Sequence, residues 1–264
     1  MTVSSSWRTA FTTLACPGWT IERIVAAARE YGYDAIEIRL LDGQVLDPRQ
    51  DAAAIRDATA RARAAGIEVC ALDTSCRLAL EGVSDLQRWI ALAGELSVPI
   101  LRVFGGETEE PEDVVNARVA ARLREITAEA EAAGVVVALE THDAFSSARR
   151  VATVLSDVPS RSAGALWDSH HPYEMGESAG EVVSLLGDRL VHVHVKDARR
   201  TADGWQLVPL GEGEVPVPEM PAALREIGYR GYLAVEWEKK WHPELAEPDV
   251  ALPQHRVALG RMTA

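Results

Sequence analysis

Residues 190–197 read LVHVHVKD, and this stretch indicates more about the fold than any other part of the chain. Apolar and polar residues alternate in it with the period of two that places successive side chains on opposite faces of a β-strand. The valines share one face, and His192, His194 and Lys196 share the other. Because buried polar groups need partners, this strand predicts a site to which other strands bring metal ligands, substrate contacts or matching charges.

On both sides of this stretch, short β-rich runs alternate with amphipathic segments that have the helical period. The predicted strands are 11–16, 33–39, 67–74, 98–106, 135–143, 163–168, 190–197 and 231–238. A hairpin or polar loop is predicted over 201–210, and the pair Ser84 and Gln87 predicts a capping box at a helix start. Eight β/α units without linker composition predict a single-domain (β/α)8 TIM barrel over 1–264. A doubly wound open sheet is disfavoured because no GxGxxG follows the first strand.

Composition excludes several classes of function. The formal net charge is −13, whereas surfaces that bind nucleic acid or anionic membranes need basic patches. The three cysteines form no CxxC motif and are expected to be reduced and buried. The sequence shows neither a secretory signal nor an apolar run of membrane-spanning length. We therefore expect a soluble cytoplasmic protein without nucleic-acid or membrane partners.

Polar residues gather at the predicted strand ends, where a (β/α)8 barrel forms its active site. Five of the seven histidines lie between residues 142 and 194. Four residues from the last four predicted strands could converge, namely Glu140, Asp168, His194 and Glu236. Three carboxylates and one imidazole are ligands that suit Mn²⁺, Mg²⁺, Co²⁺ or Fe²⁺. They do not resemble the thiolate ligands of a closed zinc site. The phase of the last strand permits Glu238 in place of Glu236.

Such a site predicts chemistry at a carbon next to a carbonyl group. A metal ion that holds two adjacent oxygens of a hydroxy-ketone polarises the carbonyl and acidifies the C–H bond between them. A flanking carboxylate can then remove that proton as a general base. Reprotonation of the resulting enediolate on the other face gives an epimer, and reprotonation on the neighbouring carbon gives an isomer.

Several motifs resemble those of the sugar phosphate isomerase/epimerase family, the xylose-isomerase-like barrels. They are ALETHD (138–143), DSHH (168–171), HVHVKD (192–197), LGEGEVP (210–216) and GYRGYLAVEWE (228–238). The resemblance covers nearly the whole chain. It implies that Glu140, Asp168, His194 and Glu236 bind one divalent ion (Mn²⁺, Co²⁺, Mg²⁺, Fe²⁺ or Zn²⁺), with Glu140 and Glu236 as the catalytic proton-transfer pair. His171 and Arg200 match substrate-contacting positions in the family's ketose 3-epimerases, and homodimers or homotetramers are usual in the family.

Further residues are candidates for contact with a carbohydrate-like substrate. His142 and Lys196 follow or end predicted strands, and Arg39 could bind phosphate, carboxylate or hydroxyl groups. His192 lies deeper in its strand than His194 and is expected behind the metal ligands. The remaining histidines, His170, His242 and His255, are expected at the surface, and the Gly211-x-Gly213 loop is a weak phosphate-binding signal.

These observations predict a metal-dependent isomerase or epimerase of a sugar, sugar derivative or cyclitol. The alternative within enzymes is a metal-dependent dehydratase of an inosose or dehydroshikimate-like keto-polyol, with His171 or Lys196 as the acid. A third alternative is an inert barrel that acts as a binding or accessory subunit. An apurinic-site endonuclease is disfavoured by the negative charge and by the lack of histidines before residue 142. Substrate, preferred metal and phosphorylation of the substrate stay open.

Overall fold

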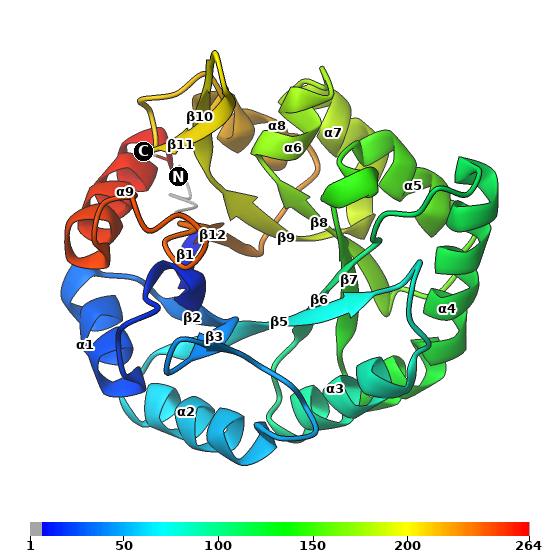
Figure 1. The fold of residues 1–264 in the computed structure, drawn as a ribbon, viewed down its shortest axis with the longest axis horizontal. Coiled ribbons are helices and arrows are strands. Elements are labelled where there is room, and N and C mark those ends of the chain that lie inside the picture. The colour runs from blue at the N-terminus through cyan, green and yellow to red at the C-terminus, as the bar shows by residue number, and fades with distance from the viewer. Residues whose placement is uncertain (1–6, 264) are drawn as a thin grey trace, which may run out of the picture.

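The computed structural model describes residues 7–263. Eight parallel strands form a closed barrel, in which the first strand pairs with the last (Figure 1). The barrel strands are β1 (Arg8–Thr12), β2 (Ala35–Ile38), β5 (Glu68–Arg77), β6 (Ile100–Phe104), β7 (Val136–Glu140), β8 (Ala163–Asp168), β9 (Leu190–Val195) and β12 (Tyr232–Val235). This architecture confirms the predicted (β/α)8 barrel.

Helices surround the barrel on its outer side (Figure 1). They are α1 (Ile21–Tyr31), α2 (Ala52–Ala64), α3 (Ser84–Glu95), α4 (Glu112–Ala133), α5 (Ala148–Ser156), α6 (His170–Glu174), α7 (Ala179–Leu186), α8 (Met220–Glu226) and α9 (Pro248–Thr263). Helix α1 ends at Gly32, whose left-handed φ of 78° favours glycine. The predicted capping box at Ser84 is wrong, because Ser84 is already helical and Val83 precedes it without a side-chain cap. Among the described helices, none combines the length and apolar character needed to cross a bilayer.

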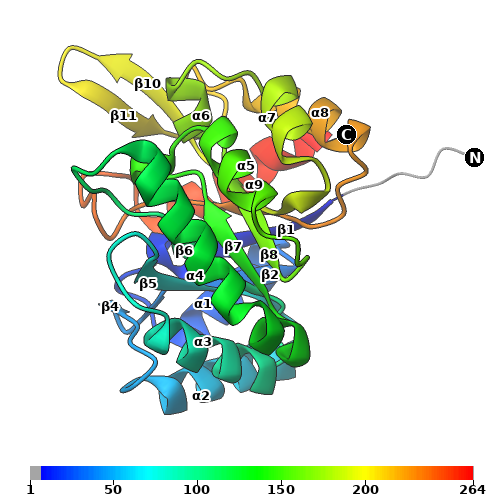
Figure 2. The same cartoon turned by 90° about the vertical axis from the view of Figure 1, so that its right-hand side faces the viewer.

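Two parts of the chain depart from the predicted boundaries. The predicted first strand, 11–16, lies earlier, because the Thr12 side chain accepts the N–H of Leu14 and starts a 3-10 turn over Thr13–Ala15. The predicted hairpin also begins earlier, with β10 (Asp197–Thr201) pairing antiparallel with β11 (Gly204–Val208). Figure 2 shows this hairpin projecting from one end of the barrel, on the same side as the small hairpin of β3 (Leu40–Leu41) and β4 (Gln44–Val45).

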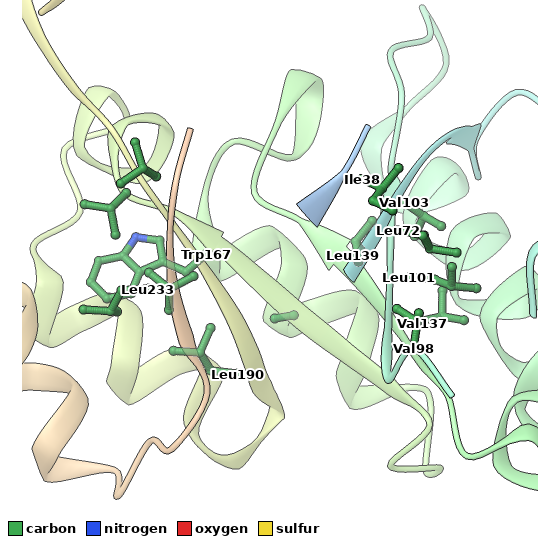
Figure 3. Close-up of a cluster of buried hydrophobic side chains, with 14 of the residues drawn as sticks. Ile38, Leu72, Val98, Leu101, Val103, Val137, Leu139, Trp167, Leu190 and Leu233 are labelled. Carbon is green, nitrogen blue, oxygen red and sulfur yellow. The ribbon is translucent and has the colours of Figure 1, made fainter. Parts of the chain in front are cut away.

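The strands bury large apolar side chains outside the barrel and small ones inside it. Figure 3 shows outward-facing residues such as Leu101, Val103, Val137 and Leu139 beside the surrounding helices. On the opposite face of the strands, mostly small side chains form two separate buried clusters: Ala10, Ala35, Cys70, Tyr232 and Ala234, and Ala71, Ile100, Ala138 and Leu166. Polar inward-facing side chains follow these clusters toward the carboxyl ends of the strands, so the fold places them together.

Candidate active site

The four predicted metal ligands meet at the carboxyl ends of neighbouring strands. Glu140 and Asp168 end β7 and β8, His194 lies in β9, and Glu236 directly follows β12. The register aligns His194 with Asp168 on one side and with Ala234 on the other. Each of the four is at most 6% exposed, and one ligand atom from each lies within 4.8 Å of the others. The structure therefore gathers one imidazole and three carboxylates in one buried cluster.

The donor atoms of this cluster fit a divalent cation. Glu140 Oε2 and Asp168 Oδ2 are buried and have no hydrogen-bond partner among residues 7–263. Each of these oxygens lies within ion-pair distance of a side-chain cation, Arg102 Nε at 3.3 Å and Lys196 Nζ at 3.0 Å. Buried carboxylate oxygens normally also accept hydrogen bonds, so both keep an acceptor position that suits a metal ion. His194 Nδ1 lies 3.0 Å from Glu140 Oε1 and 3.5 Å from Glu236 Oε1, so this ring nitrogen faces the carboxylates. Oxygen and imidazole donors of this kind bind Mn²⁺, Co²⁺, Fe²⁺ or Zn²⁺.

Lys196 provides positive charge on one side of the cluster. Its Nζ lies 3.0 Å from Asp168, 2.9 Å from Glu236 and 2.8 Å from Glu238. The contact with Asp168 is an ion pair that lacks hydrogen-bond geometry, whereas Lys196 donates hydrogen bonds to both glutamates. Glu238 thus contacts the cluster through Lys196 and is not among the four grouped ligands.

Arg102 provides positive charge on the other side. Its Nε lies 3.3 Å from Glu140 Oε2 and 3.7 Å from Asp73 Oδ1, and the arginine side chain is 3% exposed. The guanidinium also donates to the carbonyl oxygen of Thr74. Buried charges need such partners, because their desolvation costs several kcal/mol. Arg102 therefore stabilises the ionised form of Glu140.

Without a metal ion, the pKa values of the ligands diverge. Burial raises the pKa of Asp168 to about 7, although Lys196 opposes the rise. Burial also acts on Glu236, but Lys196 and His194 outweigh it and hold the pKa of Glu236 below its usual range. Burial disfavours the charged form of His194, yet the surrounding carboxylates raise its pKa well above the usual value. Since metal ligands must be deprotonated, metal binding at this site should release protons.

Behind the ligands, Glu37 on β2 joins the two histidines of β9. Glu37 Oε1 lies 2.6 Å from His194 Nε2, and Oε2 lies 2.9 Å from His192 Nε2. All three residues are fully buried. His192 lies behind the ligands, as expected from its position in the strand. The role of Glu37 is not evident from the sequence, although a carboxylate between Ile36 and Ile38 signals a polar inner face.

Three of the predicted substrate-binding residues lie together beside the ligand cluster. The rings of His142 and His171 are 4.7 Å apart, and His171 Nε2 lies 3.4 Å from Lys196 Nζ. Phe104 packs 4.7 Å from the ring of His142. The backbone N–H of His171 donates to Asp168 Oδ1, which links the histidine to the ligand cluster. The arrangement offers an aromatic wall with polar nitrogens next to the carboxylates.

The two predicted substrate-binding arginines are not part of this aromatic wall, although Glu140 and Glu236 act electrostatically on Arg39. Arg39 is buried and donates to the carbonyl oxygen of Asp73 and to Ser75 Oγ. Burial and the nearby Arg102 lower the pKa of Arg39 to about 10. Arg200 is exposed on β10, and its guanidinium lies 4.7 Å from the ring centroid of Trp205.

Two expectations for histidines outside the ligand set are wrong. His170 is 5% exposed because Trp205 of the β10–β11 hairpin packs against its ring at 4.9 Å. His255 is 1% exposed because α9 places it against Trp237, at 4.9 Å. His242 is exposed, as expected. Tertiary packing decides these cases, because each covering tryptophan lies in a distant part of the chain, Trp205 in β11 and Trp237 after β12.

The Gly211-x-Gly213 loop holds a carboxylate of the chain itself. Asp197 accepts the backbone N–H groups of Gly211, Gly213, Val215 and Ala198 at 2.9–3.2 Å. A phosphate group would need these same donors. In the structure, the N–H groups that gave the weak phosphate-binding signal bind Asp197 instead. We call this arrangement of Asp197 and residues 211–215 the clasp.

Comparisons with known proteins place this geometry in a wider context. The chain is 32% identical over 131 residues to the fructoselysine 3-epimerase of Escherichia coli O157:H7, an alignment that covers 48% of this chain and 47% of that protein. The chain thus spans about half the length of the curated relatives it matches first.

Solved structures share the fold over almost the whole chain. A structure of the IOLI protein with a bound zinc atom has a TM-score of 0.82 at 18% identity, covering 97% of this chain and 98% of that one. The probable 3-DHS dehydratase AsbF of Bacillus anthracis has a TM-score of 0.75 at 17% identity, covering 97% and 99%. The family model described as xylose isomerase-like TIM barrel matches residues 25–254. The chain therefore belongs to the xylose isomerase-like TIM barrel family.

Proposed function

We propose that this protein is a divalent-metal-dependent isomerase or epimerase acting on a sugar, sugar derivative or cyclitol. The observation that carries the proposal is the buried cluster of Glu140, Asp168, His194 and Glu236, in which two carboxylate oxygens accept no hydrogen bond from residues 7–263. The similarity to a fructoselysine 3-epimerase supports the reaction class. The structurally similar IOLI protein has a bound zinc atom, which supports a metal ion in a protein of this fold.

In this proposal the four residues hold one divalent ion. The bound ion supplies Lewis acidity, which polarises a substrate carbonyl and acidifies the neighbouring C–H bond. Glu140 and Glu236 move the proton: the carboxylate oxygen of one removes it from carbon, and the carboxyl group of the other returns a proton. Contacts with positively charged neighbours hold the pKa of both side chains down against the effect of burial, so either carboxylate can act as the base. The other must take up a proton from solvent before it returns one to carbon, and the base releases its proton to solvent at the end of the cycle.

The substrate would be bound by side chains around this pair. His142, His171 and Lys196 adjoin the cluster and offer hydrogen bonds to hydroxyl groups. Arg39 and Arg200 are assigned to more distant parts of the substrate. The burial of the carboxylates excludes bulk water, which strengthens the electrostatic interactions at the reacting carbon.

The first test is the metal content of the native protein and of Asp168→Asn, measured by elemental analysis. We expect about one Mn, Co, Fe, Mg or Zn ion per native chain and a large loss in the variant, because one ligand oxygen is replaced by a weak amide ligand. Asp143→Asn is the matched control: Asp143 contacts His142 outside the four-ligand cluster and should leave the metal content unchanged. Absence of metal from every protein, even after incubation with each ion, would favour the inert binding scaffold.

The metal-loaded protein is then incubated with ketoses and cyclitols in D₂O. Isomerisation or epimerisation should introduce deuterium at the carbon next to the carbonyl while the product keeps the skeleton of the substrate. Glu140→Gln and Glu236→Gln should slow this exchange strongly. Metal binding without exchange on any substrate of this class would contradict the proposed reaction.

A dehydratase is the second candidate. Lys196 Nζ lies 3.4 Å from His171 Nε2 and contacts Glu236 and Glu238, so an ammonium group is placed where it could protonate a leaving hydroxyl. The fold similarity to a probable 3-DHS dehydratase is compatible with this chemistry. Mass spectrometry separates the two candidates, because only dehydration removes the mass of one water molecule from the substrate.

A further inference from the structure

A buried carboxylate behind the proposed metal site has no part in the reaction described above. Glu37 is fully buried on β2, three strands away from β7 around the barrel. Its two oxygens are used by two different imidazoles, His194 Nε2 at 2.6 Å and His192 Nε2 at 2.9 Å. A carboxylate between two imidazole nitrogens at these distances accepts an N–H hydrogen bond on each oxygen.

We propose that Glu37 is a positioning residue, which orients His194 so that Nδ1 serves as the metal ligand. This inference rests on the proposed function. Because Glu37 accepts the Nε2–H, that nitrogen carries a proton, and the lone pair needed for coordination is on Nδ1. Nδ1 is also the nitrogen that faces Glu140, at 3.0 Å. A carboxylate bonded to the far nitrogen of a metal-ligating histidine fixes its tautomer and ring orientation and makes it more basic.

His192 completes this arrangement by holding Glu37. It lies two residues before His194, so both imidazoles project from the same face of β9. With one imidazole on each oxygen, the Glu37 carboxylate cannot turn without breaking a hydrogen bond. The His192 Nδ1 atom has no partner within residues 7–263, so the only side-chain hydrogen bond recorded for this ring is the one to Glu37.

A second metal ion is the competing interpretation of these residues. Glu37, Asp73 and His194 also place ligand atoms within 4.8 Å of one another. However, the 2.6 Å separation between Glu37 Oε1 and His194 Nε2 is a hydrogen-bond distance. Two ligand atoms that share an ion at about 2 Å each normally lie farther apart. The geometry therefore favours a proton between these atoms.

The test measures the dissociation constant for Zn²⁺ in competition with a chromophoric chelator at fixed pH. Glu37→Gln should bind Zn²⁺ about 10- to 100-fold more weakly than the native protein, still with one ion per chain. His192→Gln should show a smaller loss, because it frees Glu37 without removing it. His255→Gln is the control, because it also replaces a buried histidine. His255 lies in α9 and packs against Trp237, so this substitution should leave the affinity for Zn²⁺ unchanged.

A measurement on the native protein covers the case in which Glu37→Gln does not fold. In the ¹⁵N NMR spectrum of the Zn²⁺-loaded protein, His194 should carry its proton on Nε2 and the metal on Nδ1. Coordination through Nε2, unchanged affinity in a folded Glu37→Gln, or a second ion per chain would overturn the positioning role while leaving the proposed function intact. Absence of Zn²⁺ binding by the native protein would instead overturn both.

Discussion

At the scale of single residues, the charges around Lys196 support the proposed cation site. Within the described residues, four carboxylates, those of Glu140, Asp168, Glu236 and Glu238, contact two permanent cations, Lys196 and Arg102. Without a metal ion, protons on His194 and partly on Asp168 make up the difference, because their pKa values are raised. In the proposed function, a divalent ion would supply this positive charge without those protons.

His255 allows a prediction for the pH dependence of stability. Burial lowers the pKa of His255 from 6.5 to about 4, so the unfolded chain binds more protons than the folded one between these values. The contribution of His255 to stability is complete above pH 6.5 and decreases as the pH falls toward 4, by about 3 kcal/mol in full. Urea unfolding measures the free energy of unfolding of the native protein and of His255→Gln. The difference between these two free energies should become smaller as the pH falls from 6.5 toward 4. If this difference does not change with pH, the lowered pKa of His255 does not contribute to the stability of the protein.

At the scale of elements, the segment after β9 is built around one carboxylate. Asp197 begins β10 and binds the backbone of the loop that follows β11, so it closes the base of the hairpin. Lys196 directly precedes this clasp, and Trp205 of the same hairpin covers His170. The hairpin therefore connects the end of a ligand-bearing strand with the histidines beside the site.

Gly213, in the loop after β11, has no room for a side chain. A β-carbon there would lie 2.1 Å from Asp197 Oδ1 and 2.5 Å from the carbonyl oxygen of Ala198. We expect Gly213→Ala to lower the free energy of unfolding by about 1–3 kcal/mol, because the clasp must open to relieve the clash. Urea unfolding measures the loss, and limited proteolysis should show faster cleavage within residues 197–215.

Gly180 in α7 provides the control for that substitution. A β-carbon at Gly180 meets no atom of the described chain within 4 Å, so alanine fits without strain. Gly180→Ala should keep or raise the stability, by up to about 1 kcal/mol, because alanine favours the helix. Equal effects of the two substitutions would show that close contact with Asp197 does not determine the outcome at Gly213.

At the scale of the whole molecule, the proposed metal site connects distant parts of the chain. Its ligands come from β7, β8, β9 and β12, which are consecutive in the closed barrel. An ion bound to all four ligands binds the folded protein only, so it should stabilise the entire barrel. Removal of the ion should therefore affect global unfolding as well as activity.

Chelation provides the corresponding measurement. With free metal at about 1,000 times its dissociation constant, the native protein should gain about 4 kcal/mol over the chelated protein. Asp168→Asn should lose most of this increment, because the ion loses a buried ligand, whereas Asp143→Asn should keep it. A urea midpoint that does not respond to metal would show that no ion binds the native state selectively.

The sequence by itself determined the architecture and the neighbourhood of the site. The period of two in LVHVHVKD and the alternation of β-rich and helical runs are local patterns, and each strand or helix follows from side chains close together in the chain. The polar residues at strand ends could be assigned to one place because parallel barrel strands present their carboxyl ends on the same side. Ser84 shows where local patterns fail. Serine is a common N-cap residue, but in the structure Val83 occupies the N-cap position and Ser84 is already helical.

Only the tertiary structure decided which side chains contact one another. Glu37 reaches His194 from a position 157 residues away in the chain, and Lys196 contacts Glu236 and Glu238 from another strand. His255 is buried by the docking of α9. Burial, hydrogen bonding and pKa depend on these long-range contacts, because each reflects the sum of neighbours that the closed barrel brings together. The sequence therefore predicts the residue types of the site, and the barrel determines their partners.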